Sequence, residues 1–213
     1  MVHPPDTVPP DRLAALRASL AAIAESNPFQ RQRLASLPGG PLPESLEDFA
    51  ARFPLTTKAE LAADQAAHPP YGTNLTEPLA RYTRCHQTSG TSGPPLRWLD
   101  TPESWAVLRR DWMEVFRQAG VGPDDRLLFA FSFGPFLGFW LAFEAAQELG
   151  ALVIAGGGMG SSLRARVLLE NHCTVLCCTP TYALHLARTA RQEGVDLSRS
   201  QLRRLLVAGE PGG

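Results

Sequence analysis

Apolar residues recur at helical spacing near the start of the chain. Between residues 11 and 25 they stand at Leu13, Leu16, Leu20 and Ile23. This spacing is typical of an amphipathic helix, and an aspartate stands where its N-cap is expected. The first predicted element is therefore a helix that buries one face.

Two capping signals follow a Pro/Gly connector at residues 38–43. Ser45 with Asp48 resembles a capping box, and Thr57 with Glu60 forms a full one. Each signal predicts a short helix. Residues 1–80 are accordingly predicted to be a helical N-terminal arm.

The pattern changes at Tyr82 to an alternation of strands and helices. Strands are predicted at residues 82–87, 96–99, 126–131, 151–155, 174–178 and 204–208, and helices at 101–119, 136–149, 163–171 and 180–193. Repeated strand, helix and strand units require a parallel sheet with helices on both faces. The predicted fold class is α/β, with a largely parallel sheet within residues 81–213.

Two apolar stretches need a choice between interpretations. In the helix after Thr101, the residues Trp105, Leu108, Trp112 and Val115 predict a buried stripe, and a cofactor role of the tryptophans is the alternative. The stretch 127–143 carries no charge, but Gly134 and Pro135 interrupt it. We expect a strand followed by a buried helix there, and a membrane span is the alternative.

Composition narrows the class of protein. The chain has 213 residues, 44% of them hydrophobic, and a net charge of −1. It is long and apolar enough to bury a core, and its charge does not favour nucleic acid or anionic lipid as a partner. The first residues do not resemble a signal peptide, so a cytoplasmic protein is expected. Lys58 is the only lysine, and we expect it to be exposed in a first helical turn.

The four cysteines show no CxxC spacing. They are Cys85, Cys173, Cys177 and Cys178, and the last three lie in or beside a predicted buried strand. We interpret them as reduced core residues, with a metal site as the alternative. No metal ligand is predicted within this chain.

The segment TSGTSGPP, from Thr88 to Pro95, lies between the first two predicted strands. Its glycines allow positive φ, so that successive N–H groups and hydroxyls can point at one anion. It is not a Walker loop, because no GK pair occurs and no lysine follows. The alternative is an ordinary Ser/Gly surface hairpin loop.

Three further stretches follow predicted strands of the parallel sheet. They are FSFGPF at 131–136, GGGMGSS at 156–162 and AGEP at 208–211. Ligands of such sheets bind outside the carboxyl ends of the strands. A cleft that is partly aromatic and partly anion-binding suits a molecule with one phosphate end and one apolar end.

TSGTSGPP resembles the phosphate loop of adenylate-forming enzymes, and more closely that of the phenylacetate-CoA ligase group. Four other segments match in the family's order: FPLTTKAEL at 53–61, FSFG at 131–134, VLCCTPTYAL at 175–184 and AGEP at 208–211. The resemblance implies that a carboxylic acid attacks the α-phosphate of ATP and gives an acyl adenylate. Coenzyme A, or another thiol, then takes the acyl group.

The resemblance also implies roles for individual residues. The ATP phosphates would be held by Thr88, Ser89, Gly90, Thr91, Ser92 and Gly93. The adenine would be bordered by Ala208, Gly209, Glu210 and Pro211. An aromatic acyl pocket would be shaped by Phe131, Phe133, Gly134 and Phe136, for which ordinary core packing is the alternative.

The sequence departs from the family in three respects. Phe131, Ser132 and Phe133 stand where phenylacetate ligases have tyrosines and glycine, so the expected substrate is an apolar acid that need not be phenylacetate. Pro94 stands where the family has Lys or Arg, so a cation is missing unless Arg97 or a later residue supplies it. The family's catalytic lysine, its magnesium-binding acidic residue and its ribose-binding aspartate would all lie beyond Gly213. We therefore expect the N-terminal half of a ligase, inactive alone, with ATP, Mg²⁺ and coenzyme A as ligands of the whole enzyme. Its open sheet would be covered by the other half or by a partner, and a homodimer is possible.

Two other functions stay open. In a nucleotide-dependent oxidoreductase, Gly156, Gly157, Gly158 and Gly160 would hold a dinucleotide, but Ser161 breaks the GxGxxG spacing. Alternatively, a non-catalytic protein could use the same half-fold to bind a nucleotide or a partner.

Overall fold

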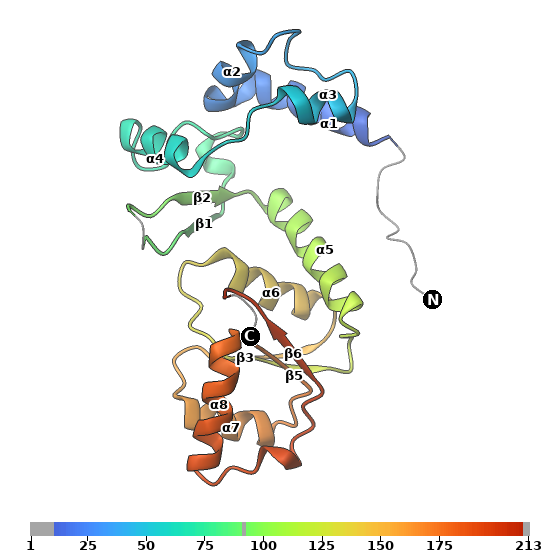
Figure 1. Cartoon of the computed structure of the whole chain (residues 1–213), viewed down its shortest axis with the longest axis vertical. Coiled ribbons are helices and arrows are strands. Elements are labelled where there is room, and N and C mark those ends of the chain that lie inside the picture. The colour runs from blue at the N-terminus through green and yellow to red at the C-terminus, as the bar shows by residue number, and fades with distance from the viewer. Residues whose placement is uncertain (1–10, 91–92, 211–213) are drawn as a thin grey trace. The chain divides into compact units, whose positions relative to one another are not determined.

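A computed structural model describes residues 11–90 and 93–210 of the chain. The chain divides into two compact units, one ending at Pro102 and the other beginning at Glu103 (Figure 1). Each unit is described separately below.

The first unit begins with helices whose ends follow from local side-chain chemistry. They are α1 (Arg12–Ser26), α2 (Pro28–Ala35), α3 (Leu46–Arg52) and α4 (Lys58–Ala67). Asp11 caps α1 by accepting the N–H of Ala14 at 2.8 Å. In α4, Thr57 and Glu60 exchange the two bonds of the predicted capping box. These two predicted helices are confirmed.

Helix α2 was not predicted from the sequence. Asn27 alone separates it from α1 and accepts the N–H of Gln30 at 3.0 Å, while Pro28 stands at the first helical position. This is a strong start signal, but the helix itself is mostly polar. No apolar stripe marked it, so hydrophobic periodicity missed it.

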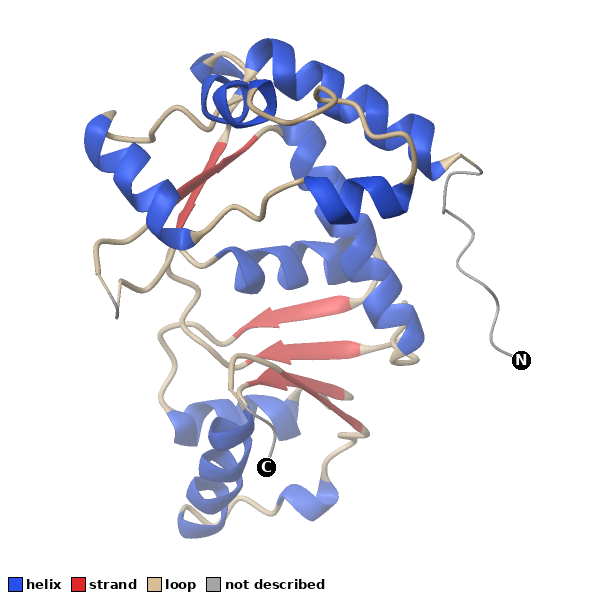
Figure 2. Cartoon of the chain, turned by 45° about the horizontal axis from the view of Figure 1, so that its top comes forward, coloured by secondary structure: helices blue, strands red, loops and turns tan. Residues whose placement is uncertain are grey.

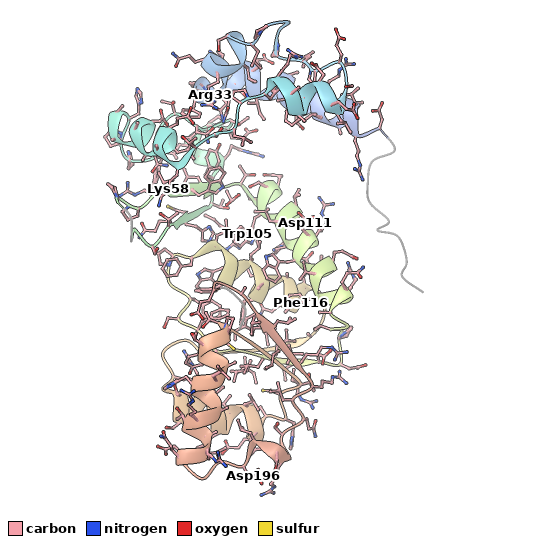
Figure 3. All side chains as sticks on the ribbon, in the orientation of Figure 1. Arg33, Lys58, Trp105, Asp111, Phe116 and Asp196 are labelled. Carbon is pink, nitrogen blue, oxygen red and sulfur yellow. The ribbon has the colours of Figure 1, made fainter. Side chains whose placement is uncertain are left out.

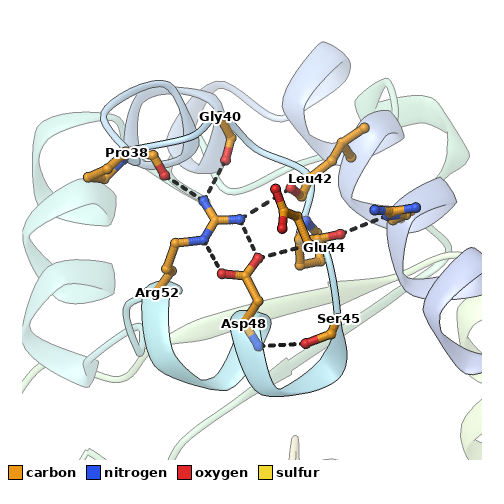
Figure 4. Close-up of polar contacts among 9 residues, drawn as sticks. Pro38, Gly40, Leu42, Glu44, Ser45, Asp48 and Arg52 are labelled. Atoms are coloured by element: carbon orange, nitrogen blue, oxygen red, sulfur yellow. Dashed lines mark hydrogen bonds and ion pairs between the residues drawn. The ribbon is translucent and has the colours of Figure 1, made fainter.

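The connector between α2 and α3 is fastened by one arginine. Arg52 donates to the carbonyl oxygens of Pro38, Gly40 and Leu42, at 2.6, 3.1 and 3.2 Å, and to both carboxylate oxygens of Asp48 (Figure 4). The hydrogen bonds from Arg52 lower the pKa of Asp48 to about 2. A planar guanidinium with five donors suits such a set of acceptors. The Pro/Gly connector is thus ordered by a specific side chain.

The capping box predicted at the start of α3 is only half formed. Ser45 Oγ accepts the N–H of Asp48 at 3.1 Å, as expected. The carboxylate of Asp48 instead accepts the N–H of Glu44, at 2.8 Å. Asp48 is shorter than the usual Glu and is also held by Arg52, so its return bond shifts by one residue.

Helices α2 and α4 are joined by an ion pair between Arg33 and Glu60. Arg33 also donates to the carbonyl of Leu55, at 2.9 Å. The segment that enters α4 is therefore anchored to α2. Lys58, in the first turn of α4, is exposed as predicted (Figure 3).

The first unit ends in a two-stranded antiparallel hairpin. A short 3₁₀ turn at Leu79–Arg81 precedes β1 (Arg84–Gln87), which pairs with β2 (Arg97–Asp100). The sequence placed the change of domain after residue 80, whereas this hairpin belongs to the same compact unit as the helices. A functional subdomain that begins at residue 81 stays a prediction.

The second unit is an alternating α/β structure. Its elements are α5 (Pro102–Gln118), β3 (Arg126–Phe129), α6 (Leu137–Glu148), β4 (Leu152–Ala155), α7 (Ser161–Glu170), β5 (Val175–Cys178), α8 (Pro180–Gln192), a 3₁₀ turn at Leu197–Arg199 and β6 (Arg204–Val207). The four strands are parallel and run in the order β4-β3-β5-β6 (Figure 2). The predicted α/β fold class is confirmed.

Two apolar cores lie on opposite faces of this sheet. On one face, Met113 and Phe116 of α5 and Ala145 of α6 pack against Leu127 and Phe129. On the other, helices α7 and α8 pack against the alternate residues of the same strands. Alternation along β3 therefore places helices on both faces, as expected for parallel sheets.

One detail of the predicted core is wrong. Val115, the last residue of the predicted stripe in α5, is 50% exposed, while Met113 and Phe116 are buried. Trp105 is buried as predicted, and its Nε1 donates to Glu144 at 2.7 Å. The buried face shifts along the helix by one residue at its C-terminal end.

A buried carboxylate joins the amino ends of the strands. Asp125, only 2% exposed, accepts hydrogen bonds from Thr174 Oγ1 at 2.5 Å, Arg203 Nη2 at 2.7 Å and the N–H of Gly122 at 3.0 Å. Burial would raise the pKa of Asp125, but these bonds outweigh it and lower the pKa.

The stretch without charges resolves into β3, a turn and α6. Among the described residues, no helix combines the length and the apolar character needed to cross a membrane.

Strand β6 forms one edge of the four-stranded sheet. Its residues Leu205 and Val207 are 52% and 46% exposed.

Candidate functional site

The candidate phosphate loop closes the β1–β2 hairpin. The N–H of Thr88 donates to the carbonyl of Leu96 at 3.0 Å, and the N–H of Leu96 donates to Thr88 Oγ1 at 3.1 Å. The hydroxyl of Thr88 therefore takes the place of a backbone acceptor in the ladder. A phosphate contact from this hydroxyl stays a prediction.

Both glycines of the loop have the backbone conformation that the sequence predicted. Gly90 has φ of 73° and Gly93 has φ of 139°, values that side-chain-bearing residues rarely adopt. A Cβ at Gly90 would also lie 3.1 Å from Cγ of Pro95. The predicted phosphate ligands Thr91 and Ser92 lie outside the described residues.

Arg97 was the nearest candidate to replace the cation missing at Pro94. Its guanidinium donates to the carbonyl of Pro70 at 3.1 Å. In this structure Arg97 therefore helps to hold the turn after α4.

The residues predicted for the acyl pocket join a cluster of aromatic rings. Phe131 stacks on Phe139 with ring centroids 4.0 Å apart, and Phe133 lies 4.8 Å from Trp140 and 5.2 Å from Phe143. Phe133 is buried in the core on the α5–α6 face of the sheet. For Phe133 this packing favours the alternative of an ordinary core residue.

Gly134 and Phe136 shape the turn between β3 and α6. Gly134 has φ of 50°, and a Cβ there would meet the ring of Phe136 at 3.1 Å. The carbonyl of Gly134 accepts a hydrogen bond from Nε1 of Trp140 at 2.8 Å. This turn is thus fixed by aromatic side chains, while Phe131 and Phe136 stay half-buried.

The predicted adenine-binding stretch follows β6 and is hydrogen-bonded to the first turn of α8. The carboxylate of Glu210 accepts the N–H of Thr181 at 3.1 Å and the hydroxyl of Thr181 at 2.9 Å. These bonds lower the pKa of Glu210, the hydroxyl contributing most. The N–H of Ala208 continues the ladder to the carbonyl of Cys178, and Gly209 turns with φ of 91°. Pro211 lies outside the described residues.

Sequence reasoning missed Arg164, which joins two strand ends. Its side chain is buried, with 7% of the residue exposed, and donates to the carbonyls of Gly156 and Ala130 at 2.9 and 3.1 Å. Its guanidinium also lies 5.0 Å from the centroid of the Tyr182 ring. The available signal was the helical face that Arg164 shares with Ala165 and Leu168, which are both buried.

Tyr182 is the first of three polar side chains that are linked by hydrogen bonds. The hydroxyls of Tyr182 and Ser161 are 2.9 Å apart, and Nε2 of His185 lies 3.2 Å from the Ser161 hydroxyl. Together with Arg164 and Glu210, these groups make the carboxyl ends of the strands polar on the α7–α8 side. The residues predicted for the acyl pocket follow β3, and those predicted for the adenine follow β6, so both groups lie at the carboxyl ends of strands of one sheet. The candidate phosphate loop belongs to the first unit.

Comparisons with known proteins identify the relatives of this chain. No protein-family model matches it. The phenylacetate-coenzyme A ligase of Pseudomonas putida is 29% identical over 210 residues, which are 97% of this chain and 46% of the relative. That of Escherichia coli (strain K12) is 29% identical over 222 residues, covering 99% of this chain and 48% of the relative.

A solved structure agrees with this result. An open conformation of 2-hydroxyisobutyryl-CoA ligase, in complex with 2-HIB-AMP and CoA, matches with a TM-score of 0.86 and 31% identity, over 94% of this chain and 47% of that one. The chain is similar in sequence to phenylacetate-coenzyme A ligases and in fold to a CoA ligase. It spans about half the length of the curated relatives it matches.

Two glycines of the GGGMG loop have a packing role. A Cβ at Gly156 would lie 2.6 Å from the carbonyl oxygen of Phe129, and one at Gly157 would lie 3.3 Å from the ring of Phe133. The loop therefore needs these glycines to approach β3, which explains them without a dinucleotide.

The four cysteines of the chain are free thiols. Burial raises the pKa of Cys173 and Cys178 to about 11, and it raises that of Cys177 further. These three match the prediction of reduced core residues. Cys85 does not, because it is exposed on β1.

Proposed function

We propose that this chain forms the nucleotide- and acyl-binding N-terminal portion of an ATP-dependent carboxylate–CoA ligase. The observation that carries the proposal is the 0.86 TM-score match, at 31% identity, to a CoA ligase whose structure contains an acyl adenylate and CoA. The aromatic cluster after β3 and the names of the sequence relatives favour an aryl acid as the substrate.

The proposed reaction has two steps. A carboxylate oxygen attacks the α-phosphorus of ATP, and the bond to the bridging oxygen of pyrophosphate breaks. The thiol sulfur of CoA then attacks the acyl carbon, and AMP leaves. In both steps negative charge builds up on a leaving phosphate, so donors fixed before the reaction stabilise it most effectively.

The residues of this chain would bind and orient ATP and the acid. Backbone N–H groups and hydroxyls of Thr88–Gly93 would contact the phosphates. The positive φ of Gly90 and Gly93 fits a loop that turns its N–H groups toward an anion. Ala208–Pro211 would border the adenine, and Phe131, Gly134 and Phe136 would border the acyl group. Phe133, which is buried in the core, would support Phe131, since their ring centroids are 5.3 Å apart. Mg²⁺ would bind through the ATP phosphates.

The test of the phosphate loop compares two glycine variants. Gly90→Val places a β-branched side chain at φ of 73°, against Pro95, whereas a Cβ at Gly122 meets no atom within 4 Å. We expect Gly90→Val to weaken ATP binding by at least about tenfold at temperatures where the chain is still fully folded, and Gly122→Val to bind normally. Equal binding by both variants would reject the loop assignment, and a wild-type chain that binds no ATP would contradict the proposal.

A second measurement separates the ligase from a non-catalytic nucleotide-binding protein with the same half-fold. Sulfamoyl adenosine carrying a phenylacetyl group mimics an aryl adenylate. An acyl site should make it bind at least about tenfold more tightly than sulfamoyl adenosine alone. Equal affinities would favour the non-catalytic alternative.

A further inference from the structure

The outer edge of β2 is occupied by a side chain of α4. Nε2 of Gln65 donates to the carbonyl of Arg97 at 2.7 Å, and the N–H of Arg97 donates to Oε1 of Gln65 at 3.0 Å. A primary amide offers one acceptor and two donors, so it can pair with a peptide group as a neighbouring strand would. Gln65 therefore satisfies both backbone groups of Arg97 on a strand edge.

This contact lies directly beside the candidate phosphate loop. Leu96, the residue before Arg97, exchanges two hydrogen bonds with Thr88, the first residue of the loop. One side of this closing pair continues into β1, and the other continues into the residue that Gln65 holds. The amide of Gln65 thus holds β2, the strand that follows the loop.

The last turns of α4 hold the surrounding chain as well. Asp64 accepts the N–H and the hydroxyl of Thr73, both at 2.7 Å. Arg97 in turn donates through Nη1 to the carbonyl of Pro70 at 3.1 Å. These bonds tie the segment after α4 to Asp64, the residue before Gln65, and to Arg97, and the Gln65 side chain is half-buried.

We propose that Gln65 is a positioning residue for nucleotide binding, which acts on the phosphate loop through the backbone of Arg97. Gly90 and Gly93 give this loop the positive φ it needs but leave it many alternative conformations. Fixing one end of the loop before the ligand arrives reduces the entropy lost on binding. The proposal rests on the proposed function, because it assumes that the loop binds the phosphates of ATP.

Three variants test this role. Gln65→Met keeps the length of the side chain but removes both hydrogen bonds. Gln65→Glu keeps an acceptor for the N–H of Arg97 and loses the donor to its carbonyl. Gln118→Met is the matched control, because the Gln118 side chain is exposed and donates to Glu114 one turn earlier in α5.

The first readout is hydrogen exchange of the Arg97 amide, which needs no nucleotide. We expect Gln65→Met to speed this exchange at least about tenfold, with Gln65→Glu between it and the wild type and Gln118→Met unchanged. An unchanged exchange rate in Gln65→Met would overturn the proposal at its structural step.

The second readout is the dissociation constant for ATP, measured beside the unfolding midpoint. We expect Gln65→Met to weaken ATP binding by about three- to tenfold at temperatures well below unfolding, again with Gln65→Glu between. Faster exchange with unchanged ATP affinity would overturn the positioning role while leaving the proposed function intact. A wild-type chain that binds no ATP would overturn both, and the exchange result would still tell whether Gln65 holds β2.

Discussion

The two ends of the parallel sheet are held by different kinds of contact. At the amino ends of the strands, the buried carboxylate of Asp125 joins Thr174, Arg203 and Gly122. At the carboxyl ends, Arg164 donates to two backbone carbonyls and Glu210 caps α8 through Thr181. At the amino ends, a charged side chain pairs with another charged side chain, Arg203 with Asp125. At the carboxyl ends, the charged side chains Arg164 and Glu210 bond instead to backbone groups and to a hydroxyl.

The glycines, by contrast, do not separate the two ends. At the amino ends, a Cβ at Gly120 would lie 2.7 Å from a side-chain nitrogen, whereas one at Gly122 would meet no atom within 4 Å. In the loop after β4, at the carboxyl ends, a Cβ at Gly156 would lie 2.6 Å from a backbone oxygen, whereas one at Gly158 or Gly160 would meet no atom within 4 Å. The two ends therefore differ in their side-chain contacts, and ligands of such sheets usually bind at the carboxyl ends.

The largest expected effect comes from breaking the amino-end network. Asp125→Ala leaves the buried hydroxyl of Thr174 and the half-exposed Arg203 without their acceptor and should lower the free energy of unfolding by about 2 to 3 kcal/mol. Urea denaturation measures this change. The control is Asp124→Ala, at an exposed neighbouring position, for which we expect about 0.5 kcal/mol or less. Similar losses in the two variants would show that the network does not hold this end of the sheet.

A smaller effect is expected at the carboxyl end. Arg164→Met keeps an unbranched apolar stem but removes the donors to Ala130 and Gly156, which should cost about 1 to 2 kcal/mol. Arg166→Met is the control, because Arg166 is exposed and its ion pair with Glu193 spans 3.8 Å. A loss from Arg164→Met that exceeds the loss from Asp125→Ala would reverse the comparison between the two ends.

Local signals in the sequence predicted much of the fold. The caps of α1 and α4 were readable because each depends on residues three positions apart. The strands of the second unit were readable because they are short apolar runs between turn residues. The positive φ of Gly90 and Gly93 followed from their place in a Ser/Gly loop.

The remaining features depend on contacts between distant residues. Gln65 meets Arg97 across 32 positions, and Arg164 meets Ala130 across 34. Neither residue type signals such a contact, since most glutamines and arginines lie on the surface. For the same reason the sequence indicated aromatic residues after β3 but not that Phe133 packs into the core.

The smallest expected effect concerns the clamp between Glu210 and Thr181. Because hydrogen bonds from Thr181 lower the pKa of Glu210 below its usual 4.5, the clamp is fully present above that value and is lost as the pH falls through the lowered pKa. The amide signal of Thr181 in NMR spectra should therefore shift in one step on acidification from about pH 6. Glu210→Gln should remove this step with little change in global stability, whereas Glu170→Gln, on the exposed end of α7, should keep it. A step that persists in Glu210→Gln would show that another group titrates there, and the carboxyl end would then not be held by this carboxylate.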